Sequence, residues 1–248
     1  MSYQLACVIP VYNHPDCLVD LVAYLAVLPH PIIVVNDGSD AQTSAILGDL
    51  AQQYSQMTLL EHAQNMGKGQ AVMTGLKKAA EMGCSHALQL DADGQHRWQD
   101  IEKFIAISEL HPTDVVIGCP VFDASVPKKR LYGRYMTHIW VWINSLSLEI
   151  KDSMCGFRIY PLAETLKIVN QHHLPQRMGF DSEILVRLGW AGLHFRNIDT
   201  PVIYPEHGVS HFRVWEDNWV LTKMHSRLFA GMLCRFPKLI TQRVKGRR

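Results

Sequence analysis

Short apolar runs alternate with segments of helical spacing over the first 120 residues, and no other feature constrains the fold as strongly. Short apolar runs occupy residues 5–11, 31–35, 57–61, 87–90 and 115–118, and the first of them is rich in β-branched residues. Between them, apolar residues recur every three or four positions, as in amphipathic helices, over residues 16–28, 41–54, 69–82 and 98–110. Strand–helix alternation of this kind predicts an α/β domain with a mostly parallel central sheet and helices on both faces.

Beyond about residue 120 the alternation is less regular. We expect a basic loop at 127–130, an aromatic-rich helix at 131–148, a short strand at 159–160, helices at 162–169 and 180–188, and a strand pair or one bent strand at 195–204. No linker divides this part of the chain. We therefore assign residues 1–214 to one domain and residues 215–248 to a basic C-terminal helix and tail.

The C-terminal segment combines apolar residues at helical spacing with an excess of positive charge. Its cations are Lys223, Arg227, Arg235, Lys238, Arg243, Lys245, Arg247 and Arg248, against Glu216 and Asp217. A basic amphipathic helix is typical of membrane-surface binding. The alternative is a helix docked on the domain and followed by a solvated basic tail. No nucleic-acid-reading motif accompanies the charge, so we expect no nucleic-acid partner.

Composition excludes several classes of protein. With 48% hydrophobic residues, 19% charged residues and a net charge of +1, the chain has the profile of a globular protein without overall attraction to nucleic acid. Six scattered cysteines without a C-x-x-C pair favour reduced thiols in a cytosolic protein. No run of 18 apolar residues and no basic signal-peptide start are present, so we expect neither a transmembrane helix nor a signal peptide.

Four polar loops follow the predicted strands of the first half, at residues 11–14, 36–40, 65–69 and 91–94. In a parallel sheet such loops lie along one edge, where ligands bind. Together they offer an aromatic ring, carboxylates, a lysine and glycine backbone, which suits a nucleotide. Each loop taken alone is equally consistent with an ordinary turn. Residues 67–72 match neither a complete G-x-G-x-x-G fingerprint nor a P-loop.

Asp91 and Asp93 follow the apolar run at 87–90 with one residue between them. If the strand continued through them, its alternation would place both carboxylates on the same side. No lysine or arginine flanks them, so they would repel each other unless a cation lay between them. Oxygen ligands suit Mg²⁺ or Mn²⁺. The alternative is a solvated Asp–Gly turn.

Four motifs, in this order and spacing, carry a resemblance to a known family. They are V-I-P-V-Y-N (8–13), V-V-N-D-G-S-D (34–40), N-M-G-K-G-Q-A (65–71) and L-D-A-D-G-Q-H (90–96). They resemble the family 2 glycosyltransferases with a GT-A fold, most of all the branch of dolichyl- and polyprenyl-phosphate sugar synthases, which D-S-M-C-G-F-R (152–158) also resembles. The resemblance covers roughly residues 5–215. It implies a nucleotide-sugar donor, a divalent metal and inversion of the anomeric centre.

The family pattern also implies roles for the residues of the nucleotide site. Pro10, Tyr12 and Asn13 would line the nucleotide pocket, and Asp37 would accept from the imino N–H of a uracil or guanine. The ribose and diphosphate would lie near Gly67, Lys68 and Gly69.

Residues of the D-A-D-G-Q-H motif would bind both the donor and the metal. Asp91 and Ala92 would contact the donor, while Asp93, helped by Gln95, would hold Mg²⁺ or Mn²⁺.

Phosphate binding and proton transfer need further residues. Our candidate cations are Arg130, Arg134 and Arg213, since arginine binds phosphate in bidentate fashion. A hydroxyl acceptor would require a carboxylate base, with Asp152 the first candidate and Asp181 the second, whereas a phosphate acceptor would require none. Asp152 is equally explained as a cap of a helix or loop, and Asp181 is better explained as the cap of the helical run that follows it. For Arg158 we expect a structural ion pair.

Two departures from the family pattern affect the prediction. Asn36 stands where relatives often have aspartate, and E-H-G-V-S-H-F-R (206–213) replaces the R-x-x-G-x-S-K expected of polyprenyl-phosphate enzymes. The second departure puts the identity of the acceptor in doubt.

The sequence predicts a metal-dependent inverting glycosyltransferase, peripheral at the cytoplasmic face of the membrane. Its donor would be a UDP- or GDP-sugar and its acceptor a lipid or polyprenyl phosphate. One alternative is a soluble or cell-envelope hydroxyl acceptor, and another is an inactive membrane-associated scaffold with a GT-A fold. A nucleotidyltransferase would need a glycine-rich basic loop after the first strand, where Y-N-H-P stands at residues 12–15.

Overall fold

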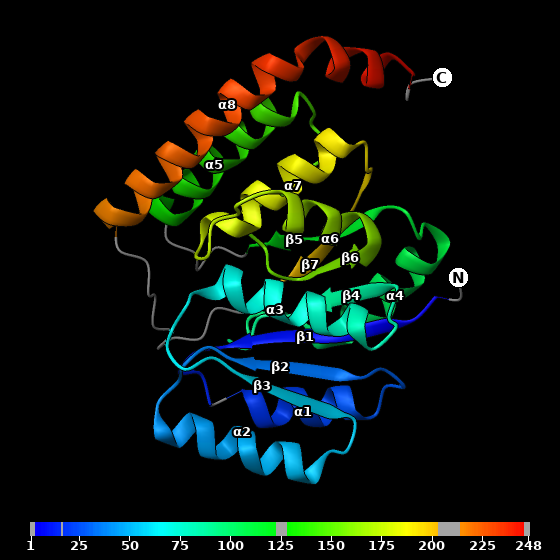
Figure 1. Ribbon diagram of the computed structural model, residues 1–248, viewed down its shortest axis with the longest axis vertical. Coiled ribbons are helices and arrows are strands. Elements are labelled where there is room, and N and C mark those ends of the chain that lie inside the picture. Colours follow the sequence, from blue (N-terminus) through cyan, green and yellow to red (C-terminus); the bar gives the residue numbers. More distant parts are fainter. Residues whose placement is uncertain (1–2, 16, 123–127, 203–213, 246–248) are drawn as a thin grey trace.

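The central sheet has seven strands in the order β3-β2-β1-β4-β6-β5-β7 (Figure 1). A computed structural model describes residues 3–15, 17–122, 128–202 and 214–245. The strands are β1 (Leu5–Val11), β2 (Ile32–Asn36), β3 (Met57–Glu61), β4 (His86–Gln89), β5 (Val115–Val121), β6 (Arg158–Pro161) and β7 (Phe195–Pro201). Every neighbouring pair is parallel except those of β6, which runs antiparallel to both β4 and β5. The predicted mostly parallel sheet is confirmed.

Eight α-helices connect or follow these strands in the part of the chain described. They are α1 (Leu18–Ala26), α2 (Ala41–Gln53), α3 (Lys68–Glu81), α4 (Ile101–Leu110), α5 (Lys128–Ser145), α6 (Leu162–Gln171), α7 (Gly179–Ala191) and α8 (Val214–Lys245), with a short 3₁₀ helix η1 (Trp98–Asp100) before α4. Asp40 caps α2, because its side chain accepts from the Thr43 N–H at 2.8 Å. The expected loop at 127–130 is wrong, since α5 already begins at Lys128; Pro127 lies outside the described residues. The strand predicted from residue 195 is the single strand β7, and residues 203 and 204 also lie outside the described part.

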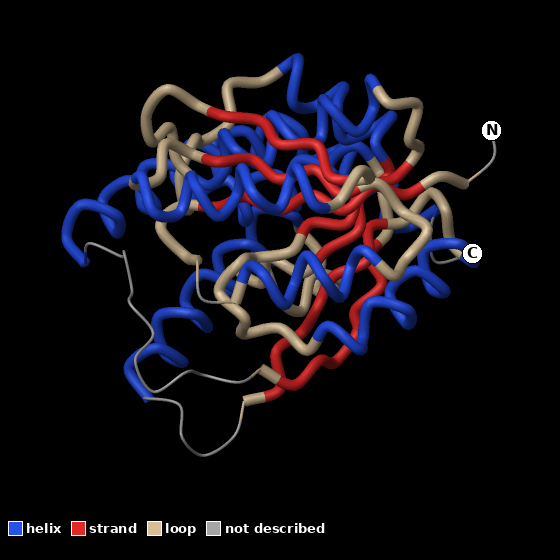
Figure 2. The backbone as a smooth tube through the Cα atoms, turned by 90° about the horizontal axis from the view of Figure 1, so that it is seen from below, coloured by secondary structure: helices blue, strands red, loops and turns tan. Residues whose placement is uncertain are grey.

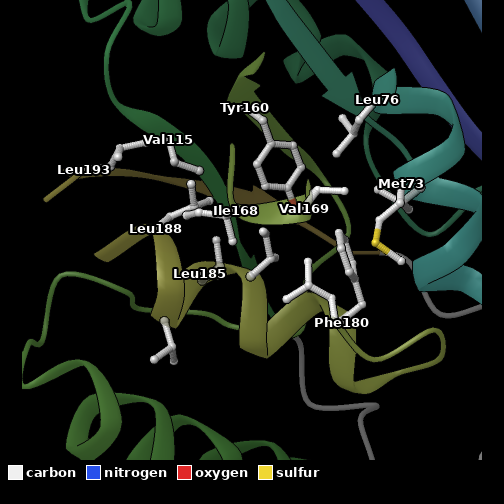
Figure 3. Packing of buried hydrophobic residues seen from close by; sticks show 14 of the residues in the cluster. Met73, Leu76, Val115, Tyr160, Ile168, Val169, Phe180, Leu185, Leu188 and Leu193 are labelled. Carbon is white, nitrogen blue, oxygen red and sulfur yellow. The ribbon is translucent and has the colours of Figure 1, made fainter. Parts of the chain in front are cut away.

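Helices cover both faces of the sheet (Figure 2). Successive residues of β1 point to opposite faces, so Val8 joins one hydrophobic cluster while Cys7 and Ile9 join the other. The Cys7 face is covered by α1, α2 and α4. On the Val8 face, Figure 3 shows side chains of α3, α6 and α7 meeting over the sheet. Each face therefore buries its own core, which holds the strand ends in fixed positions.

Helix α8 lies alongside α5 (Figure 1) and is docked on the domain through one of its faces. Met224, Leu228 and Met232 are buried in the same cluster as α7. Arg227 adds an ion pair at 2.5 Å to Glu183, a fully buried residue of α7. The docked-helix alternative is thus observed for this face. No helix among the described residues combines the length and the hydropathy that a membrane crossing requires.

Candidate functional site

The carboxyl ends of β1, β2, β3 and β4 lie along one edge of the sheet, and the strand order reverses between β1 and β4. Such a reversal is where open α/β sheets bind their ligands. Loops on this edge are tied together: Asn13 N–H donates to Ser39 Oγ at 3.1 Å, and Asp40 N–H donates to Asn13 Oδ1 at 2.8 Å. The prediction that the polar loops gather on one edge is therefore confirmed.

Pro10, Tyr12 and Asn13 are half-buried at the carboxyl end of β1, at the predicted edge. Asn13 adopts a positive φ of 53°, a conformation that asparagine tolerates better than most residues, and this turns the chain away from the strand. A nucleotide contact of these three residues remains a prediction.

Asp37 joins two of the loops from a buried position, with an exposed fraction of only 2%. Its Oδ1 accepts from Met66 N–H at 2.9 Å and lies 2.7 Å from His62 Nδ1. Its Oδ2 accepts from Gly67 N–H at 2.7 Å. These contacts fix the start of α3 and give Asp37 a structural role. Its contact with a nucleotide base remains a prediction.

Gly67 and Gly69 lie at close packing contacts, and their predicted place near ribose and diphosphate remains a prediction. Gly67 has φ +99°, and an added Cβ would lie 2.6 Å from the Gln176 carbonyl oxygen. At Gly69 an added Cβ would lie 2.5 Å from Phe180 Cβ and 2.6 Å from the Pro175 carbonyl oxygen. The missing side chains thus let α3 approach the segment that leads into α7.

β4 ends at Gln89, so Asp91 and Asp93 lie in the following loop and strand alternation does not position them. No lysine or arginine flanks Asp91 in sequence, but a protein cation from another element reaches it. Lys68 Nζ, from the first turn of α3, lies 2.8 Å from Asp91 Oδ1. Burial alone raises the pKa of Asp91, but Lys68 and His96 together hold it well below its usual range, so the carboxylate is ionised. The predicted place of Lys68 near ribose and diphosphate remains a prediction; what is observed is this ion pair. Ala92 is buried in the core, which leaves only its backbone for the predicted donor contact.

Lys68 also connects Asp91 to a second buried pair. Its Nζ lies 3.1 Å from Asp181 Oδ2 in the first turn of α7. Arg158 is fully buried, donates to the Asp181 carbonyl oxygen at 2.7 Å and lies 3.5 Å from its carboxylate. The structural ion pair predicted for Arg158 is therefore confirmed. Two carboxylates and two cations alternate along this chain of contacts, so their charges cancel where water is excluded. Asp181 does not cap α7.

Asp152 is held by a dense set of donors at an exposed fraction of 4%. Arg134 binds it in bidentate fashion, with both nitrogen–oxygen distances at 2.7 Å. Met154 and Cys155 donate their backbone N–H groups to Oδ1 at 2.9 and 2.7 Å, and His138 Nε2 lies 3.2 Å from Oδ2. Burial raises the pKa of Asp152, but the hydrogen bond from His138 and the Arg134 charge outweigh burial and lower it far below its usual range. A carboxylate with so low a pKa is a poor proton acceptor.

One small pocket, of about 60 Å³, brings several of these groups together. Its lining is Asp91, Asp93, Gln95, His96, Pro120, Arg134, Met154, Cys155, Gly156 and Val202. Sequence reasoning missed His96 and Gly156, although both lie inside the quoted motifs. An added Cβ at Gly156 would clash with the Asp91 carboxylate, so only glycine fits there. The described residues do not include Arg213 or the side chain of Arg130.

The donor set of this pocket fits a divalent cation that arrives with phosphates. Burial and the neighbouring Asp91 raise the pKa of Asp93, so a cation beside it would favour the ionised carboxylate. Its Oδ1 accepts from Gln95 N–H at 3.0 Å, which fixes the turn and brings the Gln95 amide to the same pocket. In the described part of the chain no three His, Cys, Asp or Glu residues form a complete metal site. Mg²⁺ typically takes one or two carboxylates and completes its shell with water and substrate phosphates.

Comparison with known proteins agrees with this geometry. The family model described as glycosyl transferase family 2 matches residues 6–171, two thirds of the chain. The dolichyl-phosphate beta-glucosyltransferase ALG5D of Trichomonas vaginalis is 30% identical over 206 residues, which cover 72% of this chain and 59% of that protein. The UDP-N-acetylglucosamine–dolichyl-phosphate N-acetylglucosaminyltransferase of Methanococcus voltae is 27% identical over 219 residues, which cover 82% of this chain and 87% of that protein. The chain thus spans less than two thirds of the T. vaginalis relative.

A solved structure extends the comparison to the fold. The mannosyltransferase PcManGT from Pyrobaculum calidifontis, in complex with GDP-Man and Mn²⁺, superposes with a TM-score of 0.56 at 13% identity, covering 94% of this chain and 76% of that one. The predicted GT-A fold is confirmed. With its family match over two thirds of its length, the chain belongs to glycosyl transferase family 2.

Proposed function

We propose that this protein transfers a sugar, with inversion, from a nucleoside diphosphate to a lipid phosphate at a membrane surface. One observation carries the choice of acceptor: both carboxylates predicted as bases are already engaged. Asp152 is bound by Arg134, and Asp181 by Lys68 and Arg158. A hydroxyl acceptor needs a base to take its proton, whereas a phosphate attacks through an oxygen that is already negative. The dolichyl-phosphate acceptors named for the two relatives support the same choice.

In this proposal the pocket holds the charged groups of both substrates. Asp93 and Gln95 hold Mg²⁺ or Mn²⁺, which when bound stabilises the charge that develops on the leaving diphosphate. Asp91, kept ionised and fixed by Lys68, accepts from donor hydroxyl groups. Arg134 lines the same pocket and supplies positive charge for phosphate oxygens. Asp152 acts by holding the Arg134 guanidinium in position.

The proposed membrane contact uses the solvent face of α5 and α8. Of the exposed large hydrophobic side chains in the described residues, more than half lie on these two helices. On α8 they include Trp219 (61% exposed) and Leu233 (54%), with Lys223 and Lys238 exposed on the same helix. Apolar and aromatic side chains beside lysines favour the boundary between lipid tails and headgroups. We propose a peripheral position on the cytoplasmic leaflet, as predicted.

Sedimentation with anionic liposomes tests the membrane contact. Replacing Trp219 and Leu233 together with serine should reduce the bound fraction, because both side chains face solvent and leave the core intact. Leu110→Ser is the matched control, since Leu110 is 71% exposed on α4, which belongs to the other face of the sheet. Equal binding of all variants, or equal loss, would argue against the proposed surface.

Calorimetric titration with UDP and GDP, with and without Mn²⁺, tests the donor site. Wild type should bind one of the nucleotides in a metal-dependent manner, and Asp93→Asn should lose the metal dependence while keeping its thermal stability. Asp49→Asn, an exposed position on α2, is the control. Unchanged metal-dependent binding by Asp93→Asn would refute the role of Asp93.

A further inference from the structure

A second hollow, of about 390 Å³, lies between α5 and α8. Its lining comes from both helices: Gly133, Met136, Thr137, Trp140, Asn218, Leu221, Thr222, His225 and Ser226. The two helices run side by side in the same direction (Figure 1). They are in contact, since Asn144 of α5 donates to His225 of α8 and Trp140 contacts both His225 and Phe229. We call this hollow the α5/α8 groove.

The groove begins next to the pocket that contains Asp93. Gly133 lines the groove and its neighbour in sequence, Arg134, lines the pocket, so one turn of α5 reaches both. From Gly133 to Trp140 the lining follows α5 for about 10 Å, at 1.5 Å per residue. A ligand with its phosphate at Arg134 could therefore extend its remaining length along α5.

The walls of the groove suit an uncharged, apolar occupant. Its three hydroxyl side chains all donate to carbonyl oxygens of their own helices: Thr137 to Gly133 at 3.2 Å, Thr222 to Asn218 at 2.8 Å and Ser226 to Thr222 at 2.9 Å. They therefore present mainly their carbon atoms and need no partner from a ligand.

The titratable side chain in this lining, His225, is neutral. It is 5% exposed, and burial lowers its pKa to about 4, so it carries no charge at neutral pH. Its ring stacks on the indole of Trp140 with centroids 6.1 Å apart. Among the described residues, no lysine, arginine or carboxylate lines the groove. The lining thus offers no charge to bind phosphate, but it offers aromatic and aliphatic surface.

We propose that the α5/α8 groove binds the first part of the hydrocarbon chain of the lipid-phosphate acceptor, while the phosphate lies at Arg134. The inference rests on the proposed function and adds a subsite to it. Exposed apolar side chains continue on both helices beyond the groove, with Ile143 on α5 and Phe236 on α8. The rest of the chain would pass along them into the membrane.

Gly133 allows the groove to be filled without disturbing the fold. An added Cβ there would meet no atom within 4 Å, and its φ is an ordinary one. Gly133→Phe should therefore occupy the groove and leave the core unchanged. The matched control is Gly48→Phe, because Gly48 lies within α2, where an added Cβ also meets nothing within 4 Å.

The test is photo-crosslinking of the full chain with a polyprenyl phosphate that carries a diazirine in its first isoprene units. We expect mass spectrometry to place the label on residues 133–140 and 218–226. Gly133→Phe should reduce this labelling about tenfold, as loss of apolar burial in one subsite predicts, and Gly48→Phe should not reduce it. Label elsewhere, no label, or equal labelling of both variants would overturn the proposal. Competition by phospholipid but not by unlabelled polyprenyl phosphate would also overturn it, because the occupant would then be membrane lipid.

Transfer assays separate this proposal from the function on which it rests. With long-chain polyprenyl phosphate, Gly133→Phe should raise KM about tenfold. With an isoprenyl phosphate of one unit, too short to fill the groove, it should leave KM nearly unchanged. Absence of transfer by wild type to either phosphate would refute the proposed function. Wild-type transfer to both, with equal effects of Gly133→Phe, would refute the groove alone.

Discussion

Replacing Asp152 with asparagine distinguishes a positioning carboxylate from a catalytic base. In the Asp152→Asn variant the remaining side-chain oxygen can still accept from the Met154 and Cys155 N–H groups and from Arg134 Nη2. The amide nitrogen then faces Arg134 Nε, which is a donor, where a carboxylate oxygen stood at 2.7 Å. Breaking a buried pair by removing one partner costs about 3–5 kcal/mol. Because the Arg134 side chain retains 17% exposure, we expect the lower end, about 3 kcal/mol of unfolding free energy.

Urea denaturation followed by circular dichroism measures this cost, and the midpoint of thermal unfolding should fall by roughly 6–12 °C for a chain of this size. Adding Arg134→Met to Asp152→Asn should restore at least about 1 kcal/mol of the unfolding free energy, because the double variant no longer contains an unpaired buried guanidinium. Asp152→Asn alone and Arg134→Met alone should lose transfer activity to a similar extent, since the Asp152 carboxylate acts through the Arg134 guanidinium. A stable Asp152→Asn with kcat reduced about 10²- to 10⁴-fold, beside an active Arg134→Met, would refute this reasoning and make Asp152 a base.

Three further predictions test the buried charges and the backbone. Lys68→Met should lower the free energy of unfolding by about 3 kcal/mol at pH 7, because Asp91 loses its cation and the pKa of Asp91 rises. This loss should shrink towards pH 4 as the Asp91 carboxylate becomes protonated. Denaturation at both pH values measures the difference. Gly67→Ala should destabilise the protein more than Gly83→Ala, as measured by thermal melts. Both glycines have positive φ, but of the two only Gly67 also lacks space for a Cβ. Gly83→Ala should therefore lower the free energy of unfolding by only about 1–2 kcal/mol. The pKa of His225 in the folded state, about 4, lies below its unfolded value, so protonation favours the unfolded chain. Wild type should therefore lose roughly 2–3 kcal/mol of unfolding free energy through this group as pH falls from 6.5 to 4. His225→Phe should lose less over the same pH range.

The fold was accessible from sequence because strand and helix periodicities differ. Runs of apolar residues located the first four strands to within one residue, while β5 continues three residues past its predicted end at residue 118. The order of the strands implied the shared edge where the loops meet. β6 was harder, since its four residues lie between β4 and β5 and run antiparallel to both, which local pattern does not reveal. Strand β4 shows how strongly a prediction of side-chain direction depends on where a strand ends. Because β4 ends at Gln89, the alternation expected for Asp91 and Asp93 does not apply.

The site was accessible as a set of loops but not as a set of contacts. Residues near Asp91 in sequence contain no lysine or arginine, yet Lys68 reaches it from a helix that starts 23 positions earlier. Pairing of this kind depends on tertiary structure, as does the pairing of Asp152 with Arg134. The same limit applies to α8, whose apolar residues were identified correctly as a group. Only the packed structure separates Met224 and Leu228, which are buried, from Trp219, which is exposed.

Chemical analysis of the product formed from labelled UDP- or GDP-sugar and polyprenyl phosphate tests the central claim most directly. The proposal predicts a metal-dependent, lipid-extractable sugar phosphate whose label is released by mild acid, with the anomeric configuration opposite to that of the donor. It also predicts that Asp93→Asn forms no such product. A product that survives mild acid, retained configuration, or transfer only to hydroxyl acceptors would contradict it.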